Sequence, residues 1–98
     1  MFPLQKNLAF TVSGKRIVFL NQPLRSRSIA EKLTADIIVV TGNPKLYIKD
    51  ISAVFDCRQI VFDNTNALWK IEKWKKDCDS IHLRFHSVPQ QGAFVMEL

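Results

Sequence analysis

The chain has 98 residues, of which 47% are hydrophobic and 23% charged, and this balance is typical of one globular domain spanning residues 1–98. No apolar run approaches the roughly 20 residues of a membrane-spanning helix, and the start lacks the basic and long apolar regions of a signal peptide, so we expect a soluble segment. The net charge of +5 is compatible with nucleic acid as a partner, although a solvated lysine-rich surface is the simpler explanation.

The first predicted element is a β-hairpin over residues 8–20. Two runs rich in β-branched and aromatic residues flank Ser13 and Gly14, and a glycine supplies the positive φ angle that a tight turn requires. A polar loop follows, and it carries two arginines, Arg25 and Arg27.

A short helix and a buried strand come next. Residues 29–33 are long enough for about one and a half helical turns, with Ser28 as the N-cap. Residues 36–40 are apolar after the first position, which is typical of a strand in a sheet covered on both faces. The loop after this strand ends in Asn43 and Pro44, which suit an N-cap and the first position of a further helix.

Two amphipathic helices are predicted, over residues 46–55 and 64–82, with a strand at 59–62 between them. Asn64 or Asn66 could cap the second helix. The predicted inward residues are Ile48, Ile51, Val54 and Phe55 in the first helix, and Leu68, Ile71, Trp74 or Lys75, Cys78 and Ile81 in the second.

The other side of the second helix is basic. It carries Lys70, Lys73 and Lys76, and Glu72 is spaced to pair with Lys76. A nucleic-acid interpretation would place these lysines on phosphates and the two tryptophans of the helix on bases. Acidic residues in the same helix favour the simpler interpretation, in which the tryptophans pack and the lysines are solvated.

The chain ends with two predicted strands, over residues 83–88 and 92–98, which a turn at 89–92 connects. The order of elements predicts an α/β fold. We expect a mixed sheet with parallel inner strands, a β-hairpin at each end of the chain, and about two to three helices.

Residues that could carry chemistry are few. The three glycines are too far apart for a phosphate-binding loop, and Cys57 and Cys78 lack metal-site spacing. His82 and His86 have the spacing of a zinc pair on a helix, but the residues between them alternate like a strand. Asp63 is the best-placed acid, and its usual role before a helix is to interact with the helix N-terminus.

Several phrases in succession resemble a known family. "GKRIVFL", "LTADIIVVTGNP", "QIVFDNTNALW" and "HSVPQQGAFVMEL" are similar, in this order, to the carboxyl end of ComEC-type competence proteins, and the wording resembles the Bacteroidetes branch. These proteins are membrane channels that take single-stranded DNA into bacteria. Their soluble terminal part resembles a metallo-β-lactamase domain, so the resemblance implies that this chain is the second half of such a fold.

The resemblance also implies that the metal ligands of the catalytic members are missing here. Where those members have Ser-His-His-Gly after the strand equivalent to 36–40, this chain has Thr-Gly-Asn-Pro at 41–44. Their Gly-Asp phrase corresponds to residues 19–22 and their Gly-His-Pro phrase to residues 64–69, and neither stretch supplies a ligand. We therefore expect no catalytic residue, no metal and no cofactor, because asparagine is a weak zinc ligand.

The hypothesis from the sequence is a non-catalytic domain of a DNA-uptake channel, whose parent lies in the bacterial cytoplasmic membrane. One alternative is a metal-dependent nuclease-type hydrolase completed by a partner chain, in which His82, His86 and Asp63 would converge. Another is a protein-interaction module unrelated to DNA. The candidate contact residues for single-stranded DNA are Arg25, Arg27, Asn43, Asp63, Asn64 and Asn66.

Half of a two-sheet sandwich leaves an apolar sheet face without its usual cover. We expect a second copy of the chain, or another part of the membrane channel, to pack on that face.

Overall fold

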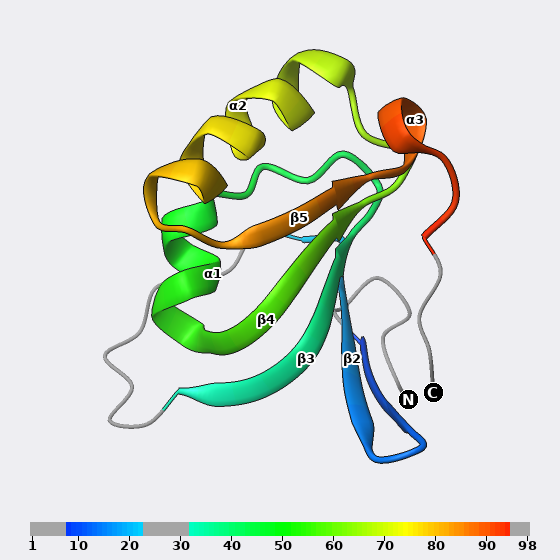
Figure 1. Cartoon of the computed structure of the whole chain (residues 1–98), viewed down its shortest axis with the longest axis vertical. Coiled ribbons are helices and arrows are strands. Elements are labelled where there is room, and N and C mark those ends of the chain that lie inside the picture. The colour runs from blue at the N-terminus through cyan, green and yellow to red at the C-terminus, as the bar shows by residue number, and fades with distance from the viewer. Residues whose placement is uncertain (1–7, 23–31, 95–98) are drawn as a thin grey trace.

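The computed structural model describes residues 8–22 and 32–94. One five-stranded sheet has a spatial order that follows the chain (Figure 1). The first two strands pair antiparallel and all other neighbours pair parallel, which confirms the predicted α/β class with a mixed sheet. The strands are β1 (Leu8–Val12), β2 (Lys15–Leu20), β3 (Leu33–Val40), β4 (Phe55–Phe62) and β5 (Arg84–Ser87), and the helices in the described residues are α1 (Ile48–Val54), α2 (Leu68–Ser80) and α3 (Val88–Gln91).

The N-terminal hairpin is confirmed. Val12 pairs with Lys15, so that only two residues form the turn between β1 and β2. Both of them, Ser13 and Gly14, have positive φ angles, of 49° and 76°. A two-residue turn with two left-handed positions matches the right-handed twist of the flanking strands, which explains why the turn needs a glycine.

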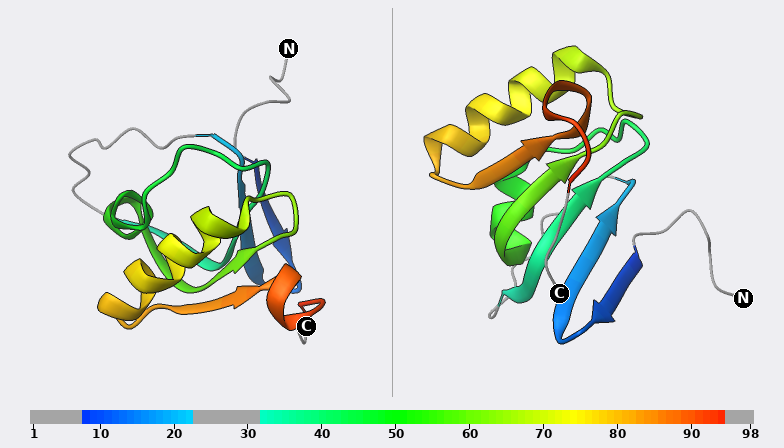
Figure 2. Two further views of the ribbon diagram at one scale, coloured as in Figure 1. Left: turned by 90° about the horizontal axis from the view of Figure 1, so that it is seen from above. Right: turned by 45° about the vertical axis from the view of Figure 1, so that its right-hand side comes forward.

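Both long helices cover the same face of the sheet (Figure 2). The parallel strands β3, β4 and β5 are neighbours in chain order, and right-handed crossovers between strands in this order place the two connecting helices, α1 and α2, on one side. The core therefore forms between α1, α2 and this face of the sheet. Its members are Val18, Leu20, Ala35, Ile38, Val40, Leu46, Ile48, Ile51, Val54, Phe55, Ile60, Phe62, Ile71, Trp74 and Cys78.

The opposite side of the sheet, called the open face below, carries apolar side chains without a helix over them in the described residues. In the middle of it Ile37 and Val61 are buried, but toward β1 the side chains of Phe10, Val12 and Phe19 are 49%, 40% and 37% exposed. The prediction that the strand at 36–40 is covered on both faces agrees with the burial of Ile37 and Ile38 on its two sides, although Val39 is only half-buried. Among the side chains that the structure describes, strand alternation and register place these apolar residues on the open face: Phe10, Val12, Ile17, Phe19, Ile37, Val39 and Val61.

The predicted start of the first helix is wrong. Asn43 has a φ angle of 57°, whereas an N-cap residue adopts an extended backbone, and α1 begins only after Tyr47. At the other end, Phe55 is not the last inward residue of the helix but the first residue of β4. The helix thus passes directly into the strand.

The second helix is also shorter than predicted. Its N-cap position is Ala67, so neither Asn64 nor Asn66 caps it. Ile71, Trp74 and Cys78 form the buried stripe, while the two end residues predicted to face inward, Leu68 and Ile81, are 56% and 45% exposed. A helix end that extends past the sheet has nothing to cover its apolar side chains.

The end of the chain differs from the predicted hairpin. The predicted turn at 89–92 is instead the one-turn helix α3, in which Pro89 occupies the first turn, where a missing N–H has no cost. Residues 92–94 are not a strand, and the rest of the predicted strand lies outside the described residues, as do Arg25, Arg27 and most of the predicted helix at 29–33. Leu33, the last residue of that predicted helix, begins β3.

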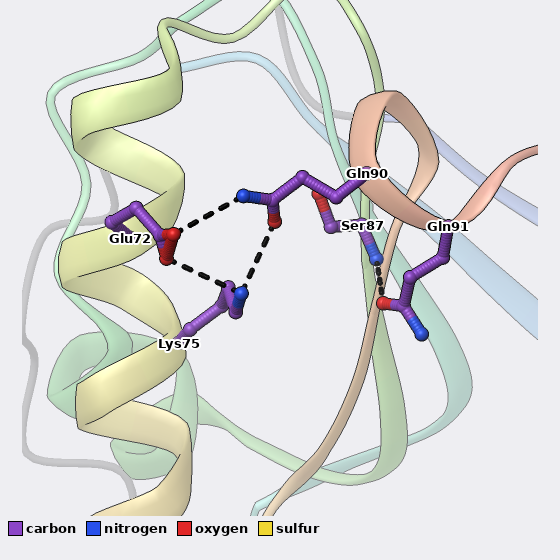
Figure 3. A network of polar contacts seen from close by, with 5 residues as sticks. All are labelled: Glu72, Lys75, Ser87, Gln90 and Gln91. Carbon is purple, nitrogen blue, oxygen red and sulfur yellow. Dashed lines mark hydrogen bonds and ion pairs between the residues drawn. The ribbon is translucent and has the colours of Figure 1, made fainter.

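A polar triangle joins α3 to α2 (Figure 3). Gln90 Nε2 donates to Glu72 Oε1 at 3.1 Å, and Lys75 Nζ donates to Gln90 Oε1 at 3.2 Å. Lys75 Nζ also lies 3.2 Å from Glu72 Oε2, so the ion pair of Glu72 is with Lys75 and not with the predicted partner, Lys76. On the β5 side, the side-chain oxygen of Gln91 accepts a hydrogen bond from the backbone N–H of Ser87.

We expect acid to loosen the contact between α3 and α2. The hydrogen bond from Gln90, followed by that from Lys75, lowers the pKa of Glu72 from its ordinary value of 4.5. A carboxylate with a lowered pKa stabilises the folded state above its unfolded pKa, and this contribution is lost as the pH falls through the lowered pKa. A pH titration of the Gln90 side-chain amide by NMR should therefore show a transition below pH 4.5. Glu72→Gln should remove it, and Asp79→Asn, at the far end of α2, should not.

Candidate functional site

The loops that follow the parallel strands meet at one edge of the sheet. The chain continues the sheet's hydrogen bonding past the strand ends, because Thr41 N donates to Leu20 O at 3.0 Å and Asp63 N donates to Val40 O at 3.3 Å. The loop after β3, residues 41–47, thus lies beside the loop after β4. In α/β sheets, this edge is where ligands usually bind.

Asn66 is the centre of the contact between these two loops. This residue is only 5% exposed, and its Nδ2 donates to Val40 O at 2.8 Å and to Asp63 O at 3.1 Å. Its Oδ1 accepts a hydrogen bond from Asn43 N at 3.0 Å. A buried amide that satisfies three backbone groups holds the two loops in one arrangement.

Asn43 returns this contact from the other loop. Its Oδ1 accepts a hydrogen bond from Ala67 N, the N-cap position of α2, at 2.9 Å. Beside it, Gly42 N donates to Thr65 Oγ1 at 2.6 Å, and the Thr65 hydroxyl donates to Asp63 Oδ1. We call this cluster the amide clasp, and its members are Gly42, Asn43, Asp63, Thr65 and Asn66.

The structure therefore brings together three of the predicted contact residues, Asn43, Asp63 and Asn66. Their polar side-chain atoms join the two loops, so we assign them a positioning role. Asn64 is exposed, and the structure gives it no polar partner. Arg25 and Arg27 lie outside the described residues.

The ligand set of the nuclease alternative does not converge within the part of the chain that the structure describes. His82 lies near the start of β4, in a hollow with Phe55, whereas Asp63 follows the end of β4. The strand between them implies a separation on the order of 20 Å at about 3.3 Å per residue. His86 is in β5, with Nε2 2.8 Å from Gly92 O. Among residues 8–22 and 32–94, no three His, Cys, Asp or Glu side chains are grouped as metal ligands would be.

The two cysteines are protonated thiols at neutral pH. Burial is the first cause in both cases, and it raises the pKa of Cys57 to about 11 and the pKa of Cys78 to about 12. The thiolate is the form that attacks substrates and binds metals. Both residues are therefore packing residues in this fold.

A groove of about 360 Å³ lies beside the clasp, between the loop after β3 and the N-terminal half of α2. Trp74 lines it from the core side, where its Nε1 donates to Leu46 O at 2.8 Å and its ring stacks on Phe62. Tyr47 and Trp69, by contrast, are 54% and 68% exposed. We call this the aromatic groove, and its lining residues are Asn43, Pro44, Lys45, Leu46, Tyr47, Trp69, Lys70, Lys73 and Trp74.

The aromatic groove is positively charged. Lys73 Nζ lies 5.5 Å from the centre of the Tyr47 ring, and Lys49 Nζ lies 5.8 Å from the same centre. Lys70 Nζ lies 5.7 Å from the centre of the Trp69 ring and donates to Asn43 O and Pro44 O. None of the described lining residues is acidic. The groove therefore combines exposed rings with cations, which suits an anionic aromatic ligand.

Tyr47 and Trp69 were not among the contact residues predicted from the sequence. The expectation that the tryptophans pack is confirmed for Trp74, whereas Trp69 is mostly exposed. The spacing of the two tryptophans could have indicated this difference. Trp69 and Trp74 are five positions apart, so they point about 140° apart around the helix. One helix cannot bury both tryptophans against a single sheet.

These features define a small α/β domain with a one-sided sheet, whose loop edge carries an aromatic and basic groove. The chain belongs to the family of the ComEC C-terminal domain, because the model of this family matches residues 3–98. The family is one of membrane proteins of competence and DNA uptake, which confirms the family recognised in the sequence. No curated protein and no solved structure matches the chain. In the described residues, no helix is long and apolar enough to cross a membrane.

Proposed function

We propose that this chain is a non-catalytic domain of a DNA-uptake membrane protein, and that it contacts single-stranded DNA through the aromatic groove. Membership of the family supports the link to DNA uptake. The observation that carries the proposal is the groove itself, where three lysines and two exposed rings line one hollow without a described acidic neighbour.

The non-catalytic part of the proposal rests on the amide clasp. The residues after β3 and β4 are at the edge where a catalytic site would be expected, and their amides and hydroxyls are bonded to the neighbouring loop. The purified protein, incubated with labelled single-stranded DNA and Mg²⁺, Mn²⁺ or Zn²⁺, should leave the DNA intact. Cleavage that Asp63→Ala or His82→Ala abolishes would support the metal-dependent hydrolase instead.

The lysines of the groove should give the affinity for DNA a measurable dependence on salt. Each phosphate that a protein neutralises on a single strand contributes about −0.7 to the slope of log K against log salt. The double variant Lys45→Ala/Lys73→Ala should therefore bind an oligodeoxythymidine more weakly and show a slope smaller by about 1.4. Fluorescence anisotropy over a series of salt concentrations measures both quantities.

Lys32→Ala is the matched control for this experiment. Lys32 is exposed next to the start of β3, at the opposite edge of the sheet, so its removal lowers the net charge without changing the groove. Equal slopes for the control, the double variant and the unchanged protein would contradict contact through these lysines. Absence of measurable binding at low salt would overturn the DNA-contact role altogether.

We further propose that a second copy of the chain covers the open face. The rings of Phe10 and Phe19 contact each other edge to face, with centres 5.8 Å apart, and both are partly exposed beside Val12. Two sheets that pack face to face bury such residues between them, and the same patch on both copies suits a two-fold axis. Contiguous exposed apolar residues mark interaction surfaces in soluble domains.

Charge on the open face should break this dimer. We expect the unchanged protein to form dimers and Phe10→Lys to be monomeric in size-exclusion chromatography with light scattering, because an ammonium group cannot be buried unpaired between two sheets. Ile81→Lys is the control, since Ile81 is 45% exposed at the end of α2, away from the open face. A monomeric unchanged protein at high concentration would count against the second copy.

A further inference from the structure

Resting on the proposed function, we infer that the aromatic groove recognises unpaired bases, with Tyr47 and Trp69 as two stacking surfaces and the neighbouring lysines on the phosphates between them. The ligand class is single-stranded nucleic acid with exposed bases. Duplex DNA does not fit this mode, because its base faces are already stacked on one another.

The two walls of the groove are fixed with respect to each other. On the loop side, Leu46 O accepts a hydrogen bond from the buried Trp74 Nε1, one residue before Tyr47. On the helix side, Lys70 Nζ donates to Asn43 O and Pro44 O, one residue after Trp69. Each aromatic residue is thus adjacent in sequence to a group that ties the loop to α2. The stacking surfaces are held in place before a ligand arrives, which lowers the entropic cost of binding.

Of the three aromatic residues that line the groove, two are exposed and one is buried. Trp74, in the same helix, is 3% exposed, whereas Trp69 is 68% exposed and Tyr47 54%. Only lysine ammonium groups, at 5.5 to 5.8 Å from the ring centres, accompany the two exposed rings among the ring contacts of the described residues. A base stacked on an aromatic ring is a stronger contact than a solvent-exposed cation–π pair. A base stacked on Tyr47 therefore displaces the Lys73 ammonium group, which becomes available for the adjacent phosphate, while Lys70 keeps its hydrogen bonds to the loop.

The experiment compares three probes of equal length: an oligodeoxythymidine, an abasic oligonucleotide with the same phosphodiester backbone, and a duplex. The unchanged protein should bind the oligodeoxythymidine roughly ten-fold or more tightly than the abasic strand, because each stacked base contributes to affinity. Trp69→Ala and Tyr47→Ala should each weaken binding of the oligodeoxythymidine by a similar factor and leave binding of the abasic strand unchanged. Trp69→Phe and Tyr47→Phe, which keep an aromatic ring, should retain most of the affinity.

Tryptophan fluorescence gives a second measurement. Stacking on Trp69 should quench the emission of the unchanged protein, and Trp69→Phe, which keeps the buried Trp74, should lose the quenching. Equal affinity for the oligodeoxythymidine and the abasic strand, with no effect of the aromatic variants, would overturn the stacking inference and leave the DNA contact through lysines intact. Binding to none of the probes would instead overturn the proposed function.

Discussion

Asn66→Ala should lower the free energy of unfolding by about 3 kcal/mol, whereas Asn64→Ala, two residues earlier, should change it by less than about 0.5 kcal/mol. The Asn66 side chain is buried and satisfies Val40 O and Asn43 N, and each buried polar group left without a partner costs about 1–3 kcal/mol. Asn64 is exposed and has no partner of this kind. Urea denaturation of both variants measures the difference.

Asn66→Ala should also change the aromatic groove. Asn43 N bonds to Asn66, and the carbonyl oxygen of Asn43 accepts from Lys70, so the loss of the Asn66 amide loosens the loop that carries Tyr47. Similar destabilisation in the Asn64 and Asn66 variants would mean that water replaces the clasp without cost, and it would contradict the positioning role.

Trp74→Ala should lower the free energy of unfolding by about 3–5 kcal/mol, and Trp69→Ala should change it by no more than about 0.5 kcal/mol. Trp74 is 3% exposed and stacks on Phe62, with ring centres 5.3 Å apart, so its truncation leaves a cavity between α2 and the sheet. Trp69, on the same helix, is mostly in solvent. Because small domains have a total stability of about 5–15 kcal/mol, Trp74→Ala removes much of it.

Trp74→Phe separates packing from hydrogen bonding. Phenylalanine keeps an aromatic ring against Phe62 but leaves Leu46 O without the indole N–H, so a loss of about 1–3 kcal/mol is expected. Thermal or urea unfolding followed by circular dichroism measures all three variants. Equal losses for Trp69→Ala and Trp74→Ala would contradict the assignment of one tryptophan to the core and the other to the surface.

The parts of the fold that local chemistry controls could be predicted from the sequence. The hairpin was predictable because Ser13 and Gly14 sit between two β-rich runs, and a two-residue turn fixes the register of its own strands. The buried stripe of Ile71, Trp74 and Cys78 was predictable from the helix period. The ends of the helices were not, since a helix stops being buried where the sheet beneath it ends, as at Leu68 and Ile81.

The candidate site was only partly predictable. The sequence placed Asn43, Asp63 and Asn66 at strand ends, and the structure does bring them together. Their role was not accessible, because two partners of Asn66, Asn43 N and Val40 O, are 23 and 26 residues away in the chain and meet it only through the parallel pairing of β3 and β4. The groove was missed for the same reason, since its two walls come from segments that are far apart in the sequence.

The sequence by itself determined the α/β class, the turn chemistry of the first hairpin and the family, because these depend on residue types and their spacing along the chain. The tertiary structure alone decided which amide joins two loops, which tryptophan reaches solvent and which sheet face stays open. These features depend on the order in which the strands assemble. With each strand beside its predecessor, the helices gather on one face, the loops meet at one edge, and the opposite face stays without a helix in the described residues.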